Sequence, residues 1–499
     1  MKKNHNLRSR AIKGTFWVAL ANILGRAITL ISMPVLARLL SKADFGVFGI
    51  ITTIAMISQV IVSFGFDLWY VKSSDKEKTR YAIFIKVSLL SIFILCIGLA
   101  FLAQPLSVFY KDPQLKTLMY WFALYFIIGG ASQILRQQLA KHLEFKKTSL
   151  ATIAKQITQA IVSIFIAIYF KNVYALLLGF IAGGIIEFIV LFTITAKPFF
   201  EGLSHFFSID IFHAFKKNGT FTISTMSSQL INTAARYIST PIFGRTSGLS
   251  ATGLFVTMDS LITQPLNIII GSISTTSLSV LAKVPNNNLA NISLRISRLL
   301  LVISAPVFAF LWLYSEETIN IFLGAKWVDG ANVLRLLMLP AFFNIVVSPI
   351  SQLFIILNKP QRLLVWNIIF FTSNVVAIIL GSHFGFYFAV LCYAIVGVIM
   401  RLTLQIMTSQ LLSISIWSFI KLYFEFMPIW IPLILPGIVI KLYFDHIWAI
   451  FIYAVCGLLM YFYLIKKYRP RVHSEIKTIY HTIKPDKFSF IKDRNDQQI

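Results

Sequence analysis

The chain has 499 residues, of which 57% are hydrophobic and only 13% are charged, and its formal net charge is +26. A soluble domain contains about 25% charged residues, so this composition excludes an ordinary soluble protein. The apolar residues form runs of about 20, the length at which an α-helix spans the hydrocarbon core of a bilayer. These runs do not alternate with polar residues, which excludes a membrane β-barrel.

The basic excess has a simple explanation in a membrane protein. In a soluble protein it would indicate a nucleic-acid partner, but short cytoplasmic loops of membrane proteins collect Lys and Arg. Most of the 45 Lys and Arg residues fall on the cytoplasmic side if both termini are placed there. We therefore expect a multi-pass protein with both termini cytoplasmic, membrane lipids around it and no nucleic-acid partner.

The apolar runs predict an all-α integral membrane protein with about 14 transmembrane helices. The first predicted segment has one arginine, Arg26, at its centre, followed by Pro34. An arginine at this depth costs about 2.5–3.5 kcal/mol on insertion scales, so it requires compensation. In chain order the predicted segments are 14–37, 45–66, 82–103, 115–135, 149–170, 173–196, 218–243, 250–275, 294–314, 331–356, 362–382, 384–409, 420–442 and 446–466.

The turn after the first segment marks an internal repeat. Residues 37–48 parallel residues 244–255, and Pro34 falls on Pro241 at the same offset. We therefore predict two pseudo-symmetric six-helix lobes, an N-terminal lobe over 1–196 and a C-terminal lobe over 218–410. Because six is an even number, both lobes have the same orientation, so their approximate two-fold axis lies along the membrane normal. A central site is expected between the lobes.

The other parts of the chain lie outside this repeat. Residues 197–217 have an apolar face at helical spacing and a basic end, which predicts a cytoplasmic amphipathic linker at the membrane surface. Residues 411–466 are predicted to form two extra transmembrane helices, and residues 467–499 a basic cytoplasmic tail.

Three basic residues inside predicted spans are candidate substrate-binding residues: Arg26, Arg236 and Lys155. Arg236 lies in the helix of the second lobe that corresponds to the helix of Arg26, so the two would face one central space. A guanidinium matches phosphate geometry, which favours an anionic ligand. Alternatively, either arginine pairs with a buried acid for structural reasons, and Lys155 extends its ammonium to the cytoplasmic surface.

Two acids inside predicted spans, Asp259 and Glu187, are candidate coupling-ion residues for a proton or sodium ion. The structural alternative for Asp259 is an ion pair with Arg236, because their predicted segments are adjacent. No catalytic, metal-ligand or cofactor motif is present in the sequence, so we expect neither an enzyme nor a cofactor.

The turn over residues 37–46, ARLLSKADFG, resembles the turn that joins the first two helices of polysaccharide flippases. These are the O-antigen and teichuronic-acid type members of the multidrug/oligosaccharidyl-lipid/polysaccharide exporter superfamily. Residues 65–71, GFDLWYV, also resemble the family pattern, although many members have a small residue at the position of Trp69.

This resemblance implies a transporter in the bacterial inner (plasma) membrane. Its substrate would be an undecaprenyl-diphosphate-linked oligosaccharide, moved from the cytoplasmic to the external leaflet through a cationic cavity between the lobes. Polysaccharide polymerase and glycosyltransferases are possible partners. Three alternatives stay open: a cation-coupled multidrug exporter of the same fold, a membrane-embedded polymerase or acyltransferase, and a scaffolding membrane protein.

Overall fold

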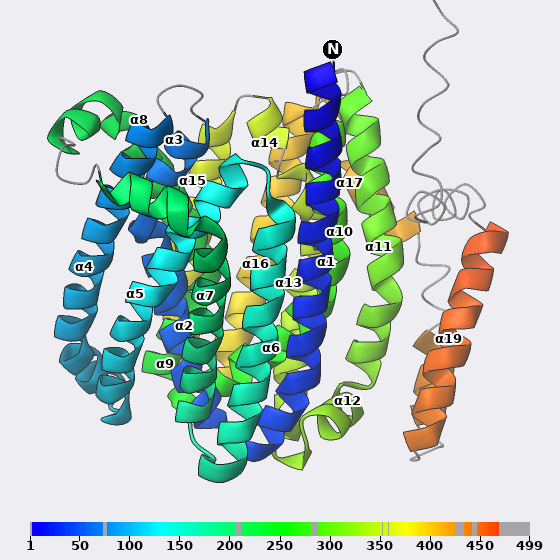
Figure 1. Cartoon of the computed structure of the whole chain (residues 1–499). Coiled ribbons are helices and arrows are strands. Elements are labelled where there is room, and N and C mark those ends of the chain that lie inside the picture. Colours follow the sequence, from blue (N-terminus) through cyan, green and yellow to red (C-terminus); the bar gives the residue numbers. More distant parts are fainter. Residues whose placement is uncertain are drawn as a thin grey trace, which may run out of the picture.

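The computed structural model is a bundle of long, roughly parallel helices (Figure 1). It describes residues 2–72, 77–204, 211–281, 288–351, 353–357, 359–425, 434–441 and 447–468. The helices of the first half are α1 Lys2–Leu39, α2 Lys42–Ser63, α3 Phe66–Lys72, α4 Glu77–Tyr110, α5 Gln114–Lys141, α6 Phe145–Phe170 and α7 Tyr174–Ser204.

The second half contains a comparable series of helices. They are α8 Ile211–Tyr237, α9 Ser239–Thr246, α10 Leu249–Leu281, α11 Leu289–Leu313, α12 Ser315–Phe322, the 3₁₀ helix η2 Ala325–Gly330, α13 Ala331–Ile350, α14 Leu353–Ile356, α15 Pro360–Ser382, α16 Phe386–Leu411, α17 Trp417–Glu425 and α19 Ile447–Tyr468.

Ten helical stretches in the described residues are long and apolar enough to cross a membrane. They coincide with predicted segments one to six and nine to twelve, which confirms an all-helical multi-pass membrane protein. Helices α8, α10 and α19 lie at the predicted seventh, eighth and fourteenth segments. The thirteenth segment falls partly on residues 426–433, outside the described residues, so the total of 14 stays a prediction.

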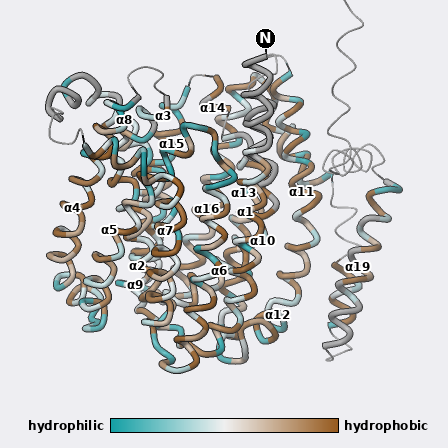
Figure 2. The backbone as a smooth tube through the Cα atoms, in the orientation of Figure 1, coloured by the Kyte–Doolittle hydropathy of each residue, from teal (hydrophilic) through white to brown (hydrophobic). Residues whose placement is uncertain are grey.

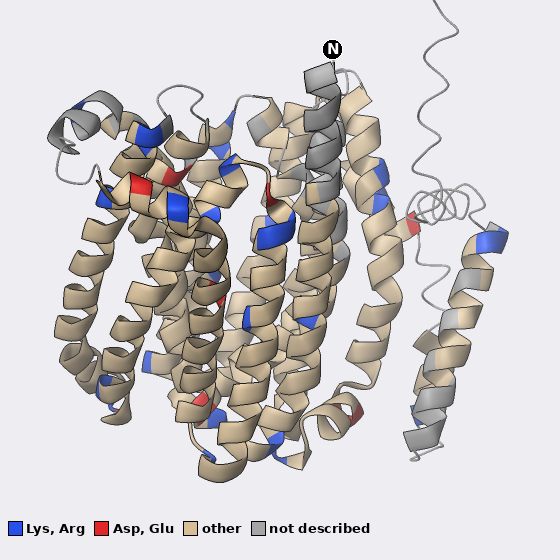
Figure 3. Ribbon diagram, in the orientation of Figure 1, with Lys and Arg blue, Asp and Glu red and all other residues tan. Residues whose placement is uncertain are grey.

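Polar residues gather at the two ends of the bundle and apolar residues along its middle (Figure 2). Charged residues follow the same distribution, with few along the middle of the helices (Figure 3). This pattern fits a bilayer, because charges are costly in hydrocarbon and stable at its two surfaces.

The predicted linker over 197–217 is described only in part. Helix α7 continues to Ser204, and residues 211–217 form the start of α8. Residues 205–210 lie outside the described residues. The described parts of this segment therefore extend the two neighbouring helices.

Two large hydrophobic clusters hold the bundle together. One is formed by residues of α2, α3, α4, α5 and α7 and includes Phe122 and Leu177. The other is built almost entirely from α9 to α17 and includes Trp327 and Phe354. The two clusters follow the two halves of the chain.

Helices α2 and α10 connect the halves at a very close crossing. A Cβ atom added to Gly46 would lie 2.0 Å from the backbone oxygen of Leu249, and one added to Gly253 would lie 1.7 Å from that of Lys42. In the repeat, Gly46 corresponds to Gly253 and Lys42 to Leu249, so the contact is reciprocal. This is the geometry of two elements related by an approximate two-fold axis, and small residues permit it.

We predict that Gly253→Ala destabilises the protein by about 1–3 kcal/mol, because the added methyl group forces the two backbones apart. Thermal unfolding of the purified protein in detergent measures this as a lower melting temperature. Gly98→Ala is the control, since no atom lies within 4 Å of its added Cβ. Equal melting temperatures for the two variants would contradict a tight crossing.

Candidate functional site

Arg26 of α1 lies at the contact between the two halves of the chain. Its Nη1 donates a hydrogen bond of 3.0 Å to Oε1 of Gln264 in α10. The side chain is half-buried, and within the described residues no acid pairs with it. Because glutamine is neutral, the positive charge of Arg26 is held in place without being neutralised.

Arg236 lies in the last turn of α8 and is exposed. In the described part of the chain it forms no hydrogen bond or ion pair, either with Arg26 or with Asp259. The structural alternative of an Asp259–Arg236 pair is therefore not seen, and a ligand-binding role for Arg236 stays a prediction.

Lys155 and Glu187 are joined in one ion cluster, although the sequence suggested separate roles for them. The Nζ of Lys155 in α6 lies 2.8 Å from Oε2 of Glu187 in α7. Arg136 of α5 forms a close ion pair with the other carboxylate oxygen. The Lys155 ammonium also lies 3.5 Å from the Tyr125 hydroxyl. One acid thus holds two bases from two other helices.

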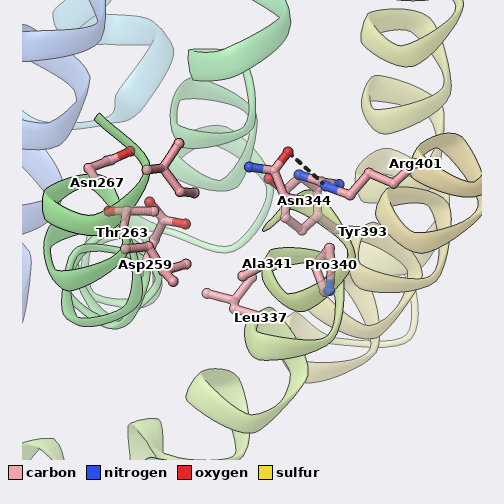
Figure 4. A pocket seen from close by; sticks show the side chains of 11 residues that line it. Asp259, Thr263, Asn267, Leu337, Pro340, Ala341, Asn344, Tyr393 and Arg401 are labelled. Carbon is pink, nitrogen blue, oxygen red and sulfur yellow. Dashed lines mark hydrogen bonds between the residues drawn. The ribbon is translucent and has the colours of Figure 1, made fainter. Parts of the chain in front are cut away.

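Asp259 of α10 lines a polar cavity of about 80 Å³, large enough for several water molecules. Figure 4 shows Asp259, Thr263 and Asn267 on one side of this cavity and Asn344, Tyr393 and Arg401 on the other. Arg401 of α16 interacts electrostatically with Asp259 across the cavity. Its Nε donates to Asn344 at 3.4 Å and its Nη1 to the Gly397 carbonyl at 2.8 Å.

No hydrogen bond or ion pair to Asp259 occurs among the residues that the structure describes. Its carboxylate is therefore balanced by Arg401 at a distance, which leaves room for a small ion or a proton between them. This arrangement keeps Asp259 a candidate coupling residue.

A second cavity, of about 340 Å³, is almost wholly apolar, and neither Arg26 nor Gln264 lines it. Leu30, one helical turn after Arg26, and Pro265, directly after Gln264, both line it. Helices α11, α12 and α19 complete its wall, which includes Phe310, Phe322 and Tyr453. Two residues of this apolar cavity are thus close in sequence to the Arg26–Gln264 contact.

The turn between α1 and α2 is locally well defined. Ser41 caps α2, and its side chain and backbone exchange hydrogen bonds with Asp44 in a capping box. The sequence SKAD therefore starts the second helix immediately after the first one ends at Leu39.

This turn is clamped by residues 321–329 of the other half of the chain, and we call this contact the inter-lobe clamp. The indole Nε1 of buried Trp327 donates to the Ala37 carbonyl at 2.9 Å. The Lys326 ammonium donates to the Leu40 carbonyl at 2.5 Å, and Lys42 forms a 2.6 Å ion pair with Asp329. Two halves are thereby fastened together at one end of the bundle.

Sequence reasoning missed Arg136 and Arg401. Arg136 follows directly after the predicted segment 115–135, and Arg401 is near the end of the predicted segment 384–409. The predicted segment stops one residue before Arg136, whereas α5 continues to Lys141, and Arg401 lies inside both its predicted segment and α16. A longer segment would have included Arg136 among the membrane charges, whereas Arg401 already lies within a predicted segment.

Comparison with known proteins identifies the family. The sequence profile of the family described as "Polysaccharide biosynthesis protein" matches residues 35–332, more than half of the chain. The chain belongs to this family. The predicted polysaccharide family is thereby confirmed.

Two curated relatives align with most of this chain. A Klebsiella pneumoniae protein described as a membrane protein in the cps region is 22% identical over 89% of the chain and 91% of its own length. The lipopolysaccharide biosynthesis protein WzxC of Escherichia coli K12 is 20% identical over 76% of each chain. These relatives are bacterial, and they give no support to the polymerase or acyltransferase alternative.

Two solved structures share the fold. The lipid II flippase MurJ, in an inward closed conformation, superposes with a TM-score of 0.76 at 17% identity, covering 92% of this chain and 99% of MurJ. An inward-facing multidrug resistance MATE family transporter gives a TM-score of 0.61 at 13% identity, covering 81% and 98%. At these identities the likeness establishes the fold and leaves the substrate open.

We predict that Arg401→Gln destabilises the protein more than the double variant Arg401→Gln/Asp259→Asn. The single variant leaves Asp259 charged in the membrane interior without its balancing cation, and coupling of such groups typically amounts to about 0.5–3 kcal/mol. Thermal unfolding of both single variants and the double variant measures this coupling. Strictly additive effects would contradict an electrostatic link across the cavity.

Proposed function

We propose that this protein moves a polyprenyl-diphosphate-linked oligosaccharide from the cytoplasmic to the external leaflet for cell-surface polysaccharide synthesis. The observation that carries the proposal is Arg26, a cation held between the two halves by neutral Gln264 at 3.0 Å. An unpaired ion in hydrocarbon costs tens of kcal/mol, so a diphosphate cannot cross the membrane without such a site. The guanidinium offers the diphosphate matching hydrogen bonds and charge.

The apolar cavity supports a lipid-linked substrate. Leu30 and Pro265 line this cavity of about 340 Å³, and both are close in sequence to the Arg26–Gln264 contact. A diphosphate at Arg26 would leave the attached polyprenyl chain on the apolar side. A soluble sugar or a nucleotide would make no use of that surface.

The bacterial relatives and the apolar helices support a place in the bacterial inner (plasma) membrane. The distribution of Lys and Arg in the sequence predicts that both termini are cytoplasmic. Glycosyltransferases would supply the lipid-linked oligosaccharide and a polysaccharide polymerase would consume it. Undecaprenyl diphosphate is the carrier proposed for the oligosaccharide.

Alternating access of the two lobes is the proposed mechanism. The inter-lobe clamp closes one end of the contact between the halves through Trp327, Lys326 and the Lys42–Asp329 pair. Releasing these bonds would open that end while the other end closes. The cations Arg26 and Arg236 would then carry the head group from one leaflet to the other.

Coupling to an ion gradient is proposed at Asp259, whose cavity contains several oxygen ligands besides the carboxylate. Glu187 was the second candidate from the sequence. Two cations already balance it, so Asp259 has the better geometry for binding a proton or sodium ion.

A cation-coupled multidrug exporter is the alternative that the shared MATE fold favours. A cationic drug would be repelled by Arg26, whereas an acidic pocket would attract it. The preference for an anionic substrate over a cationic drug therefore depends on the positive charge of Arg26.

We predict that Arg26→Ala reduces flipping at least tenfold, because a hydrogen bond to a charged group contributes about 1.5–3 kcal/mol. Cells that depend on the variant should lose surface polysaccharide and keep their drug tolerance. Lys116→Ala, at an exposed position, is the control and should leave both unchanged. Loss of drug tolerance with intact polysaccharide would favour the multidrug exporter.

We predict that a disulfide between Lys42→Cys and Asp329→Cys blocks transport, because it prevents release of the clamp. The pair is introduced after the three native cysteines have been replaced, and a reducing agent should restore transport. Each single variant should stay active, since surface ion pairs contribute little. Full transport in the cross-linked protein would exclude movement at this end.

A further inference from the structure

Tyr393 of α16 connects the polar cavity at Asp259 to a different part of the molecule. Its phenol lines the cavity together with Asp259 and Arg401 (Figure 4), and its ring packs against Phe243 of α9. We propose that Tyr393 is the positioning residue that couples the ion site at Asp259 to helix α9, and through α9 to the diphosphate site at Arg26. This inference rests on the proposed function and assigns Tyr393 a role in its coupling to an ion gradient.

On the cavity side, Tyr393 faces both charges of the ion site. It interacts electrostatically with Asp259 and with Arg401. A proton on Asp259 removes the charge of the carboxylate and a sodium ion balances it, so the field at the phenol hydroxyl changes when either ion binds. The other polar residues that line the cavity are uncharged, namely Thr263 and Asn267 of α10 and Asn344 of α13.

On its other side, Tyr393 contacts helix α9. Its hydroxyl interacts with the hydroxyl of Ser239, the buried first residue of α9. Its ring centroid lies 6.4 Å from that of Phe243 in α9 and 5.6 Å from that of Phe255 in α10, edge-on in both cases. One side chain therefore reaches the ion site with its hydroxyl and holds α9 with both its hydroxyl and its ring.

Helix α9 is separated from α8 by a break at Ile238. Helix α8 ends at Tyr237, and α9 begins at Ser239. Pro241 has no N–H, so the carbonyl of Tyr237 lacks the hydrogen bond that a helix would otherwise provide four residues later. Helices bend at prolines. The break is therefore a joint about which α9 can change its angle to α8.

This joint lies beside the proposed diphosphate site. Tyr237, the residue directly before it, is close enough to Arg26 for an electrostatic interaction between the two side chains. Arg26 is also held from α10 by its hydrogen bond of 3.0 Å to Gln264. A change of angle at the joint would move Tyr237 relative to Arg26, and so change the surroundings of the cation that holds the diphosphate.

Helix α9 also contacts the first half of the chain. The Tyr110 hydroxyl of α4 donates to the Pro241 carbonyl at 3.3 Å, and a Cβ atom on Gly244 would lie 3.0 Å from the Tyr110 ring. In the repeat, Gly244 corresponds to Ala37, whose carbonyl is held by Trp327 of the inter-lobe clamp. Helix α9 is thus the counterpart of the clamped end of α1, and its movement would alter the contact between the halves.

Linkage between ion binding and diphosphate binding tests the proposal. If inward ion movement drives the substrate outward, each must be released when the other binds, so the ion should weaken diphosphate binding. The purified full-length protein in nanodiscs is titrated with undecaprenyl diphosphate in slightly acidic and slightly basic buffer, and with sodium replaced by a large organic cation at constant ionic strength. For the wild type we expect one of the two ions to raise Kd about fivefold or more, the lower end for coupled sites.

Tyr393→Phe should abolish this dependence on the ion and keep the wild-type affinity for undecaprenyl diphosphate in the absence of the ion. The variant loses the hydroxyl and keeps the ring, so the packing of α9 is preserved. Asp259→Asn should abolish the dependence as well, and titration of the diphosphate itself is common to all variants. Tyr461→Phe is the matched control, because it removes a buried hydroxyl that donates to the Val302 carbonyl at 2.7 Å, and it should keep the dependence.

The outcomes separate this inference from the proposed function. If Tyr393→Phe lowers the melting temperature and keeps the full dependence on the ion, its role is structural and this inference is overturned, whereas coupling at Asp259 stands. If the wild type shows no dependence on protons or sodium, coupling at Asp259 is overturned together with this inference. If the wild type binds undecaprenyl diphosphate no better than uncharged undecaprenol, the proposed substrate is overturned as well.

Discussion

A charge inside a bilayer must be balanced, and this constraint explains how the interior of the protein is built. Arg26 is held by the neutral Gln264, Asp259 faces Arg401 across a cavity, and Glu187 is contacted by two bases. Only the second of these arrangements is neutral. The other two leave positive charge at the contact between the halves and within the first half. The proposed diphosphate substrate would supply negative charge, whereas a cationic drug would add to the excess of positive charge.

The halves are connected in two different ways. At Gly46 and Gly253 the backbones of α2 and α10 touch, and no side chain can slide between them. At the inter-lobe clamp the contacts are hydrogen bonds and an ion pair, which include the exposed Asp329. Polar contacts at a wet surface can be exchanged for water with little loss. The clamp is therefore the weaker of the two contacts, although both include Lys42 and lie at the same end of the bundle.

The fold was largely predictable from the sequence because apolar runs of membrane length specify helices directly. The turn from Ala37 to Gly46 and its counterpart in the second half also predicted which elements correspond, and the reciprocal Gly46–Gly253 contact agrees with that correspondence. The ion clusters were not predictable. Glu187 contacts bases on two other helices, and such pairings depend on how helices pack. Arg136 was missed for a simpler reason: a shift of a few residues in a helix end decides whether a basic residue counts as loop or membrane.

The central claim is that Arg26, at the contact between the two halves, binds the diphosphate of a lipid-linked oligosaccharide. A structure of the protein with bound undecaprenyl-diphosphate-linked oligosaccharide tests it most directly. The account predicts density for the diphosphate within hydrogen-bond distance of Arg26, with the polyprenyl chain entering the apolar cavity lined by Leu30 and Pro265. A diphosphate bound away from Arg26, at the lipid-facing surface of the bundle, would contradict it.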